Sequence, residues 1–419
     1  MRQKLDVALV SKVWNEYAQE VLYEFVWISR ASQAKALALT LLSQACVNAG
    51  GVQSGRYLRR LHIETSTLER CAPADLRTIL DCSPQLVVYS DYRSVRRNLY
   101  EESCDPRSSP EQLFSALAHP KNSLRRLSWT NYDDVSFHIH MSPMLETTAA
   151  NLEYLELNFC STHLHSMFSN PPATSTSSTI SLTLLALRSL KVTLDNATFS
   201  VLSTWSMPSL RNLSVLSADF SYAGTGFSQF FLVHGPKLIQ LELGHSSSMI
   251  EEHYLTVPPN HPNPIPLADW CPNLREFICS ADAEWNWQDP DWIAPHILLP
   301  THPLLEFIGI RDIDKRLHDD IALSPRTTAA AVNDDAPFFP LLEQISSLLH
   351  RDAFPALMFI RDMSYGSHQM RCEHPQGRIL KFWGNVLGRC RERGVWLEDC
   401  NGVNVTKRDL QRAELGLGR

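Results

Sequence analysis

The feature that most constrains this chain is a six-residue pattern, L-x-x-L-x-L, that recurs along most of its length. Clear copies are "YLRRLHI", "SLRRLSW", "NLEYLEL", "ALRSLKV", "SLRNLSV" and "KLIQLEL", and looser ones are "QLVVYSD", "NLREFIC", "LLEFIGI" and "ALMFIRD". Their last three positions alternate apolar, polar and apolar, which is the pattern of a strand with one buried face. Each copy therefore predicts a short β-strand.

Prolines mark the boundaries of these strands. Six copies have a proline two residues before the first leucine: Pro84, Pro208, Pro236, Pro272, Pro303 and Pro355. Proline cannot continue a helix, and it biases the preceding residue towards extended geometry. We therefore expect a helix to stop before each of these strands.

The spacing of the copies indicates the fold class. Their first leucines are residues 58, 86, 124, 152, 187, 210, 238, 274, 305 and 357, so successive copies lie 23 to 52 residues apart. A regular leucine-rich repeat has a period of about 20 to 29 residues. We predict an α/β fold, an irregular leucine-rich-repeat solenoid in which a parallel sheet carries outer helices. The expected insertions are "NPPATSTSSTISLT" (170–183) and "SPRTTAAAVNDDAPFFP" (324–340).

Helical segments are expected at both ends of the repeats. Residues 5–28 predict short amphipathic helices, and a further helix from about Ser32 to Cys46 precedes Gly50-Gly51. We divide the chain into a helical segment at 1–30, repeats at 31–365 and a capping unit at 366–419.

The capping unit carries three local signals. One apolar stripe at helical spacing consists of Ile379, Phe382, Trp383, Val386, Leu387 and Cys390. Gly394 is expected to end that helix, and "VWLEDC" predicts a last strand. Thr406 with Asp409 resembles an N-cap pair that opens a short helix running to Leu415. A solenoid needs its last repeat covered, and this unit is suited to cover it.

Composition argues against several classes of partner. The net charge is -7, whereas nucleic-acid binding usually shows as a basic face or a high pI. The 10 cysteines form no CxxC, and "MRQK" is not followed by the apolar run of a signal peptide. No apolar stretch is long enough to span a bilayer. We expect a cytoplasmic or nuclear protein with no cofactor, no nucleic-acid partner and no membrane association.

The first residues carry a family resemblance. "LDVALVSKVWNEYAQEVLYEFVWI" resembles the second half of an F-box, in which a leucine-rich helix leads into "VSK-x-W" and then into a helix ending in "LY" or "LW". The repeats, and the ending "RILKFWGNVLGRCRERGVWLEDCNGVNVTKRDLQRAELGLG", resemble those of fungal F-box proteins with leucine-rich repeats. The resemblance covers essentially the whole chain, and it implies that residues 1–30 are a partial F-box.

Members of that family are substrate receptors of cullin–RING ubiquitin ligases, and the resemblance implies this function here. Their F-box docks on the adaptor subunit, and their repeat region holds a protein target. The residues implied in adaptor binding are Leu5, Leu9, Val10, Trp14, Leu22 and Tyr23. The alternative is that these residues only pack a helical cap onto the first repeat.

One departure from the family pattern keeps a second function open. The helix with "LP-x-E" that normally begins an F-box has no counterpart before Leu5. We expect either an incomplete chain or a vestigial F-box. A stand-alone repeat scaffold without a ubiquitin-ligase link is therefore the alternative function.

Target binding is expected on the polar positions of the strands. These are Tyr154, Glu156, Ser189, Lys191, Asn212, Ser214, Gln240 and Glu242, followed by Glu276 and Ile278. Their mixed charge suits a protein partner better than a polyanion, although a merely solvated sheet face has the same pattern. Trp285, Trp287 and Trp292 in "EWNWQDPDW" are possible interface anchors or loop residues that pack over a long repeat.

The sequence offers little chemistry for catalysis. His138 with His140, and His163 with His165, have no third metal ligand at a suggestive spacing. The acid pairs Asp289/Asp291 and Asp312/Asp314 fit strand or loop surface. No GxSxG, HExxH or glycine-rich phosphate loop is present. We predict a protein that is not an enzyme and holds no metal.

Overall fold

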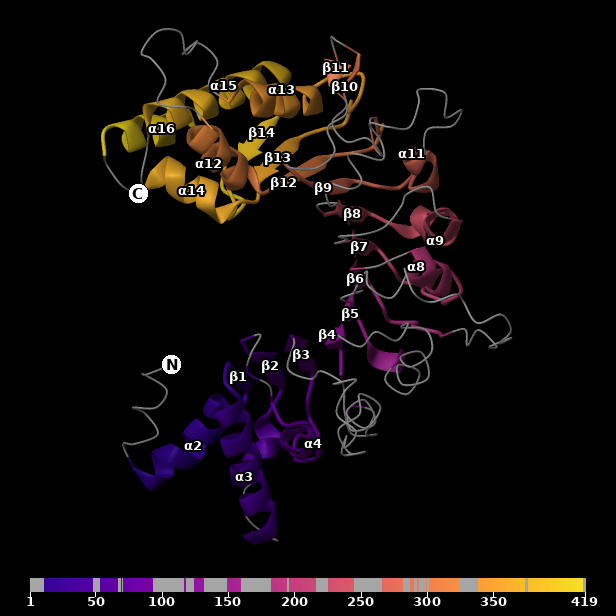
Figure 1. The fold of residues 1–419 in the computed structure, drawn as a ribbon, viewed down its shortest axis with the longest axis vertical. Coiled ribbons are helices and arrows are strands. Elements are labelled where there is room, and N and C mark those ends of the chain that lie inside the picture. Colours follow the sequence, from indigo (N-terminus) through magenta and orange to yellow (C-terminus); the bar gives the residue numbers. More distant parts are fainter. Residues whose placement is uncertain are drawn as a thin grey trace. The chain divides into compact units, whose positions relative to one another are not determined.

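Short parallel strands follow one another in sequence order within each of the two units of the chain, Met1–Leu210 and Arg211–Arg419 (Figure 1). The computed structural model describes residues 11–47, 53–66, 69, 71–92, 117, 124–131, 149–159, 182–193, 196–215, 225–244, 266–281, 287–289, 292–293, 299, 301–323, 338–373 and 376–416. Both units are α/β, with helices packed outside a parallel sheet. This is a solenoid-like arrangement.

Unit 1 carries six of the described strands, each parallel to the next. The strands are β1 (Phe25–Ile28), β2 (Arg60–Glu64), β3 (Val88–Tyr92), β4 (Arg126–Asn131), β5 (Tyr154–Phe159) and β6 (Ser189–Thr193). The helices are α2 (Lys12–Tyr23), α3 (Ala31–Val47), α4 (Pro73–Asp81) and α8 (Asn196–Ser203), with 3-10 turns η1 (Ser54–Tyr57) and η3 (Ala149–Asn151). Helix α3 packs against α4 on one side of β1–β3 (Figure 1).

Unit 2 repeats this plan and ends in a larger helical group. Its parallel strands are β7 (Asn212–Val215), β8 (Gln240–Leu243), β9 (Glu276–Ser280), β12 (Phe307–Arg311), β13 (Phe359–Asp362) and β14 (Trp396–Glu398). Its helices are α9 (Thr225–His234), η4 (Gly235–Lys237), α11 (Leu267–Trp270), α12 (Ile313–Leu323), α13 (Phe339–Leu348), α14 (Tyr365–Cys372), α15 (Gly377–Arg393) and α16 (Lys407–Glu414). A separate antiparallel pair joins β10 (Trp287–Asp289) to β11 (Trp292–Ile293).

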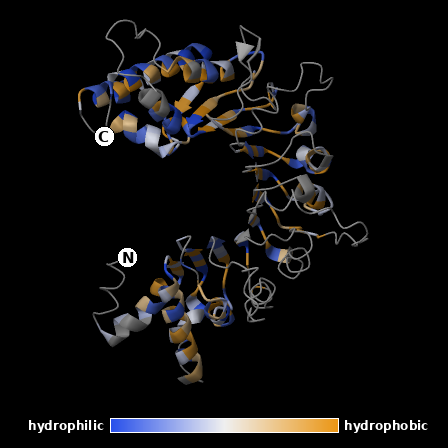
Figure 2. Cartoon of the chain, viewed as in Figure 1, coloured by the Kyte–Doolittle hydropathy of each residue, from blue (hydrophilic) through white to orange (hydrophobic). Residues whose placement is uncertain are grey.

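The leucine pattern determines where every predicted strand begins. All ten copies form strands, and each strand starts two residues after the first leucine of its copy. Pairing keeps equivalent positions in line, as in Leu127↔Leu155 and Leu241↔Phe277. The leucine positions form the core of each unit, and Figure 2 shows hydrophobic residues along the strands of both. The predicted parallel sheet with outer helices is confirmed.

A tight turn explains the prolines. The amide of the first leucine donates a hydrogen bond to the carbonyl three residues earlier, as from Leu238 to Gly235 and from Leu274 to Cys271. Pro236 and Pro272 therefore occupy the second position of a four-residue turn, which the fixed φ of proline favours. The same turn precedes the strands of the copies that begin at Leu58, Leu187, Leu210 and Leu357.

The N-terminal segment contains a strand that the sequence did not suggest. Helix α2 starts after Ser11, whose hydroxyl accepts a hydrogen bond from the amide of Trp14 at 3.2 Å. Directly after α2, strand β1 pairs in parallel with β2, with Phe25 opposite Arg60. The first strand of the sheet thus lies within the range 1–30 that we assigned to a helical segment. Helix α3 matches the predicted helix at 32–46.

The C-terminal signals are confirmed in detail. All six residues of the apolar stripe on α15 are buried, and Gly394 ends that helix with φ of 77°. Thr406 and Asp409 form a reciprocal capping box at the start of α16. The free edge of β14 is covered by the segment that follows it, where the amide of Val405 donates to the carbonyl of Leu397 at 2.8 Å. Most of the two predicted insertions, 170–181 and 324–337, lies outside the described residues.

Candidate functional site

The side chains predicted to bind a target lie on the face of each sheet opposite the buried leucines. They are Tyr154, Glu156, Ser189 and Lys191 in unit 1, and Asn212, Ser214, Gln240 and Glu242 in unit 2, where Glu276 and Ile278 follow on β9. Most are half-buried, but Glu156, Glu242 and Ile278 are only 3%, 9% and 5% exposed. Contacts between side chains therefore organise this face.

Glu156 is the centre of a polar cluster in unit 1. Its Oε2 accepts hydrogen bonds from the hydroxyls of Tyr92 at 2.8 Å and Tyr154 at 3.1 Å. Its Oε1 lies 2.8 Å from Nζ of Lys191. The guanidinium carbon of Arg126 lies 4.3 Å from the centre of the Tyr154 ring, a cation–π contact. The cluster spans four neighbouring strands, β3 to β6.

These contacts hold Glu156 in its charged form. Burial acts to raise the pKa of Glu156, but hydrogen bonds from Lys191, Tyr92 and Ser128 lower it below its usual range. Burial, and then the hydrogen bond to Glu156, raise the pKa of Tyr92 to about 12. At neutral pH the cluster thus contains a carboxylate and two neutral phenols, beside the basic side chains of Lys191 and Arg126.

A row of rings extends from this cluster to the first strand. Trp27 and His62 meet edge to face with ring centroids 6.0 Å apart, and His62 meets Tyr92 in the same way at 5.5 Å. Trp27 is 51% exposed. Sequence reasoning missed Trp27 because it did not identify β1. Aligning "EFVWI" with the later strands would have placed Trp27 beside His62.

Unit 2 has an equivalent glutamate with different partners. Glu242 occupies the same strand position as Glu156, and it accepts a hydrogen bond from the hydroxyl of Ser214 at 2.7 Å. Arg311, two strands away on β12, pairs with Glu242. Tyr92 is likewise two strands away from Glu156. Both units thus enclose one carboxylate through a side chain that crosses an intervening strand.

Exposed arginines lie at the starts of three strands of unit 1, β2, β4 and β6. They are Arg59, Arg60, Arg125, Arg126 and Arg188. Arg59, Arg125 and Arg188 occupy the same position, directly before β2, β4 and β6. Sequence reasoning missed them, although an arginine immediately follows the first leucine in "YLRRL", "SLRRL" and "ALRSL".

The residues implied in adaptor binding are only partly described. Leu5, Leu9 and Val10 lie outside the described residues. Trp14 is 54% exposed on α2, in line with the exposed side chains of Tyr17 and Val21 at spacings of three and four residues.

The end of α2 is more enclosed than its start. Leu22 and Tyr23 are half-buried. The predicted group is therefore divided between an exposed face and the side of α2 that contacts the first repeat.

The tryptophan segment gives less information about binding. Trp285 lies outside the described residues, while Trp287 and Trp292 belong to the antiparallel pair β10–β11. A strand pair therefore occupies part of the segment that we considered as a loop. The choice between interface anchors and packing residues stays open.

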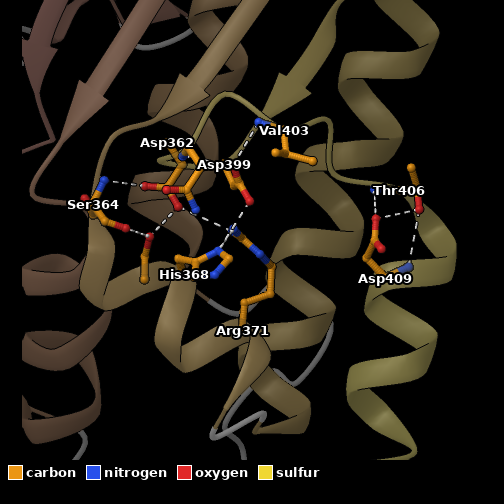
Figure 3. A network of polar contacts seen from close by, with 10 residues as sticks. Asp362, Ser364, His368, Arg371, Asp399, Val403, Thr406 and Asp409 are labelled. Carbon is orange, nitrogen blue, oxygen red and sulfur yellow. Dashed lines mark hydrogen bonds and ion pairs between the residues drawn. The ribbon is translucent and has the colours of Figure 1, made fainter. Parts of the chain in front are cut away.

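A buried polar network links the last repeats of unit 2 (Figure 3). The carboxylate of Asp362 accepts a hydrogen bond from the amide of Ser364 at 3.0 Å and another from the hydroxyl of Ser367. The guanidinium of Arg371 lies 3.3 Å from the same carboxylate. Burial raises the pKa of Asp362, and the charge of Arg371 opposes that rise.

A second buried carboxylate continues this network. Asp399 accepts hydrogen bonds from the amides of Asn401 and Val403 at 3.0 and 2.9 Å, and its Oδ2 lies 3.5 Å from Nδ1 of His368 (Figure 3). The hydroxyl of Ser367 is directed at a carboxylate and a backbone carbonyl. That geometry connects β13, α14 and the turn after β14, and it suits a structural lock better than an activated nucleophile.

The described residues contain no group of three or more His, Cys, Asp or Glu side chains placed to hold a metal ion. The histidine pairs at 138/140 and 163/165 lie outside them. Burial raises the pKa of the free thiols of Cys279 and Cys390 to about 12, so both are neutral and poorly nucleophilic. Within the described part of the chain, every helix is too short or too polar to cross a bilayer.

Comparisons with known proteins add little to this description. No protein-family model and no curated protein matches the sequence. The solved structure of a protein from Bacteroides fragilis is similar, with 12% identity and a TM-score of 0.37, over 90% of this chain and 74% of that one. At that TM-score the similarity supports no argument about function.

Proposed function

We propose that this chain is a protein-recognition solenoid of the F-box and leucine-rich-repeat type, as found in fungi. In this proposal α2 docks on the adaptor subunit of a cullin–RING ubiquitin ligase, and the sheet face holds a protein target in the cytoplasm or nucleus. The chain presents a substrate and performs no chemistry of its own.

The observation that carries the proposal is the exposed face of α2. Trp14, Tyr17 and Val21 are 54%, 75% and 47% exposed, although all three are large and apolar or aromatic. A contiguous exposed apolar face commonly marks a protein interface. Aromatic side chains in such a face are frequent anchors.

A different observation favours the stand-alone scaffold. Helix α2 is tied to the first repeat: the hydroxyl of Ser54 donates to Oε1 of Gln19 at 2.7 Å, and Ala18 is buried. The carbonyl of Glu24, just after α2, also accepts hydrogen bonds from the amides of Arg59 and Arg60. A helix joined this closely to the sheet is suited to cap the first repeat.

The two functions separate in a binding experiment. The full chain is incubated with the purified adaptor subunit, beside the variant Trp14→Asp/Val21→Asp. The control is Leu39→Asp/Leu42→Asp, which places two acids at equally exposed leucines of α3. The ligase function requires that the chain binds, that the α2 variant does not, and that the α3 control does. If the folded wild-type chain does not bind the adaptor, the scaffold function replaces it.

A further inference from the structure

The backbone ladder of unit 1 aligns the residues that precede its strands. The carbonyls of Glu24, Arg59, Val87, Arg125 and Glu153 each accept two amide hydrogen bonds from the next repeat. For example, the carbonyl of Glu24 accepts hydrogen bonds from the amides of Arg59 and Arg60. The carbonyl of Val87 accepts them from the amides of Arg125 and Arg126. The aligned residues are Glu24, Arg59, Val87, Arg125, Glu153 and Arg188.

Arginines occupy alternate places in this line. Adjacent strands lie about 4.8 Å apart, so Arg59, Arg125 and Arg188 follow one another at intervals of about 10 Å. Arg60 and Arg126, one residue later, repeat the same interval, since both face Val88 in the strand register. We call these five residues the arginine ridge.

Most of the ridge is available to a partner. Arg59, Arg60 and Arg188 make no ion pair, side-chain hydrogen bond or ring contact with any residue that the structure describes, and all three are exposed. Arg125 approaches Glu153 at 3.5 Å, but both side chains are largely exposed and such a pair contributes little. A guanidinium binds a carboxylate through two parallel hydrogen bonds, so unpaired arginines favour a carboxylate partner.

We propose that the arginine ridge binds an extended acidic segment of the target protein, with one acidic residue in every three. An extended chain advances about 3.3 Å per residue, so three residues span the interval of about 10 Å between successive arginines. A segment that crosses the strands then places one carboxylate at each of Arg59, Arg125 and Arg188. This inference rests on the proposed function, and it specifies the chemistry of the target.

The acids within the line favour a peptide over a nucleic acid. Glu24 and Glu153 alternate with the arginines, and the whole chain has a net charge of -7. A continuous phosphate backbone would meet both glutamates and be repelled. A peptide with separated acids avoids them because its intervening residues are neutral.

Two labelled peptides of identical composition test the spacing. The first is (Glu-Ser-Gly) repeated three times, and the second has its three glutamates together at one end. Binding to the full chain is followed by fluorescence anisotropy at about 50 mM salt, where screening is weak. The spaced peptide should bind at least about tenfold more tightly, which is about 1.4 kcal/mol. Equal binding of the two, or no binding of either, overturns the proposal.

Matched variants test the residues. Arg59→Gln/Arg188→Gln should weaken the spaced peptide about tenfold. Arg391→Gln/Arg408→Gln removes the same charge from exposed helical sites in unit 2 and should change nothing. Arg59→Lys/Arg188→Lys keeps the charge but loses the two-fold hydrogen bonding, so its affinity should be intermediate. An unchanged affinity in the glutamine variant contradicts the ridge.

Two further outcomes separate the sources of failure. Tighter binding of a single-stranded oligouridylate than of the spaced peptide assigns the ridge to nucleic acid and overturns the proposal. Binding to the spaced peptide without binding to the adaptor supports the arginine ridge and contradicts the ligase function. Binding to the adaptor without binding to the peptide supports the ligase function and contradicts the arginine ridge.

Discussion

The two units share one strand pattern but differ in how their outermost strands are completed. In unit 1, β1 leaves Phe25 and Trp27 about half exposed, at 45% and 51%. In unit 2, the segment after β14 turns back onto it, and the buried carboxylates Asp362 and Asp399 join that turn to α14. On β14, Trp396 is 58% exposed, so exposed aromatic side chains occur at both ends. The ends differ in the backbone, because the segment after β14 pairs with that strand. The difference teaches that a repeat sheet can have the backbone of an outer strand covered while large side chains on that strand stay exposed.

The largest expected effect comes from breaking the enclosed end. Asp362→Ala leaves Arg371 buried without its carboxylate, and removing one partner of a buried pair costs about 3 to 5 kcal/mol. Hydrogen exchange with mass spectrometry should show lost protection in α14 and α16. The double variant Asp362→Ala/Arg371→Met should recover part of the loss. If the loss in the double variant equals the sum of the losses in Asp362→Ala and Arg371→Met, the pair is not the cause.

The next effect compares one position in the two units. A Cβ at Gly55 would overlap the carbonyl oxygen of Cys82, and one at Gly235 would overlap that of Trp270. Both glycines lie three residues before a repeat leucine, so Gly→Ala should cost about 1 to 3 kcal/mol at either site. Chemical denaturation measures this, with Gly388→Ala as the control because its Cβ would meet nothing within 4 Å. If Gly55→Ala leaves the free energy of unfolding unchanged, successive repeats do not pack as closely at Gly55 as described.

A smaller effect distinguishes the units by pH. The folded pKa of Glu156 is lowered, so its contribution to stability is complete above the unfolded value of 4.5 and is lost as pH falls through the folded pKa. The pKa of Asp362 is raised, so its ionisation weakens folding as pH rises above the unfolded value of 3.8. Acidification should therefore lower the contribution of Glu156 to the stability of unit 1. It should also remove the unfavourable contribution of ionised Asp362 to the stability of unit 2.

The matched variant for this titration is Glu156→Gln. It should cost about 2 kcal/mol at neutral pH, because Tyr92, Tyr154 and Lys191 lose a charged acceptor. It should also flatten the acid dependence of hydrogen exchange in β3 to β6. An unchanged acid dependence would show that another group controls the stability of unit 1.

The smallest effect concerns the helix caps of the two ends. Thr406→Ala removes one half of the capping box of α16, and Ser11→Ala removes the single cap of α2. Each should cost about 1 kcal/mol. Local hydrogen exchange in each helix is the measurement. Unchanged protection in α2 or in α16 would contradict the role of its cap.

The sequence was most informative where a local cue repeats. Leucine spacing located the ten strands, and Gly394, Thr406 and Asp409 located the ends of the last helices. It was least informative where a residue departs from the repeat pattern. Asp362 ends the copy "ALMFIRD" at a position where the other copies are mostly apolar, and the pattern alone did not predict its burial or its partners. Arg371 and His368 reach the network through α14, and only the folded chain brings them there.

The candidate site was predicted as a face rather than as a set of contacts. The alternation of side chains along each strand gave the positions of Tyr154, Glu156 and Lys191. It did not give Tyr92, which reaches Glu156 from two strands away. Cross-strand neighbours depend on register, and register was fixed by turns that the sequence marked only at some copies.

The uniform start of the strands has a consequence for how such a chain can change over generations. Every strand begins two residues after its leucine, although successive copies are separated by anything from 23 to 52 residues. The side chains on the open face of each sheet are thus set by a short local signal and not by the length of chain between signals. Insertions and deletions between copies should therefore leave that face nearly unchanged, whereas the gain or loss of a single residue between the leucine and the strand would exchange its side chains for the buried ones.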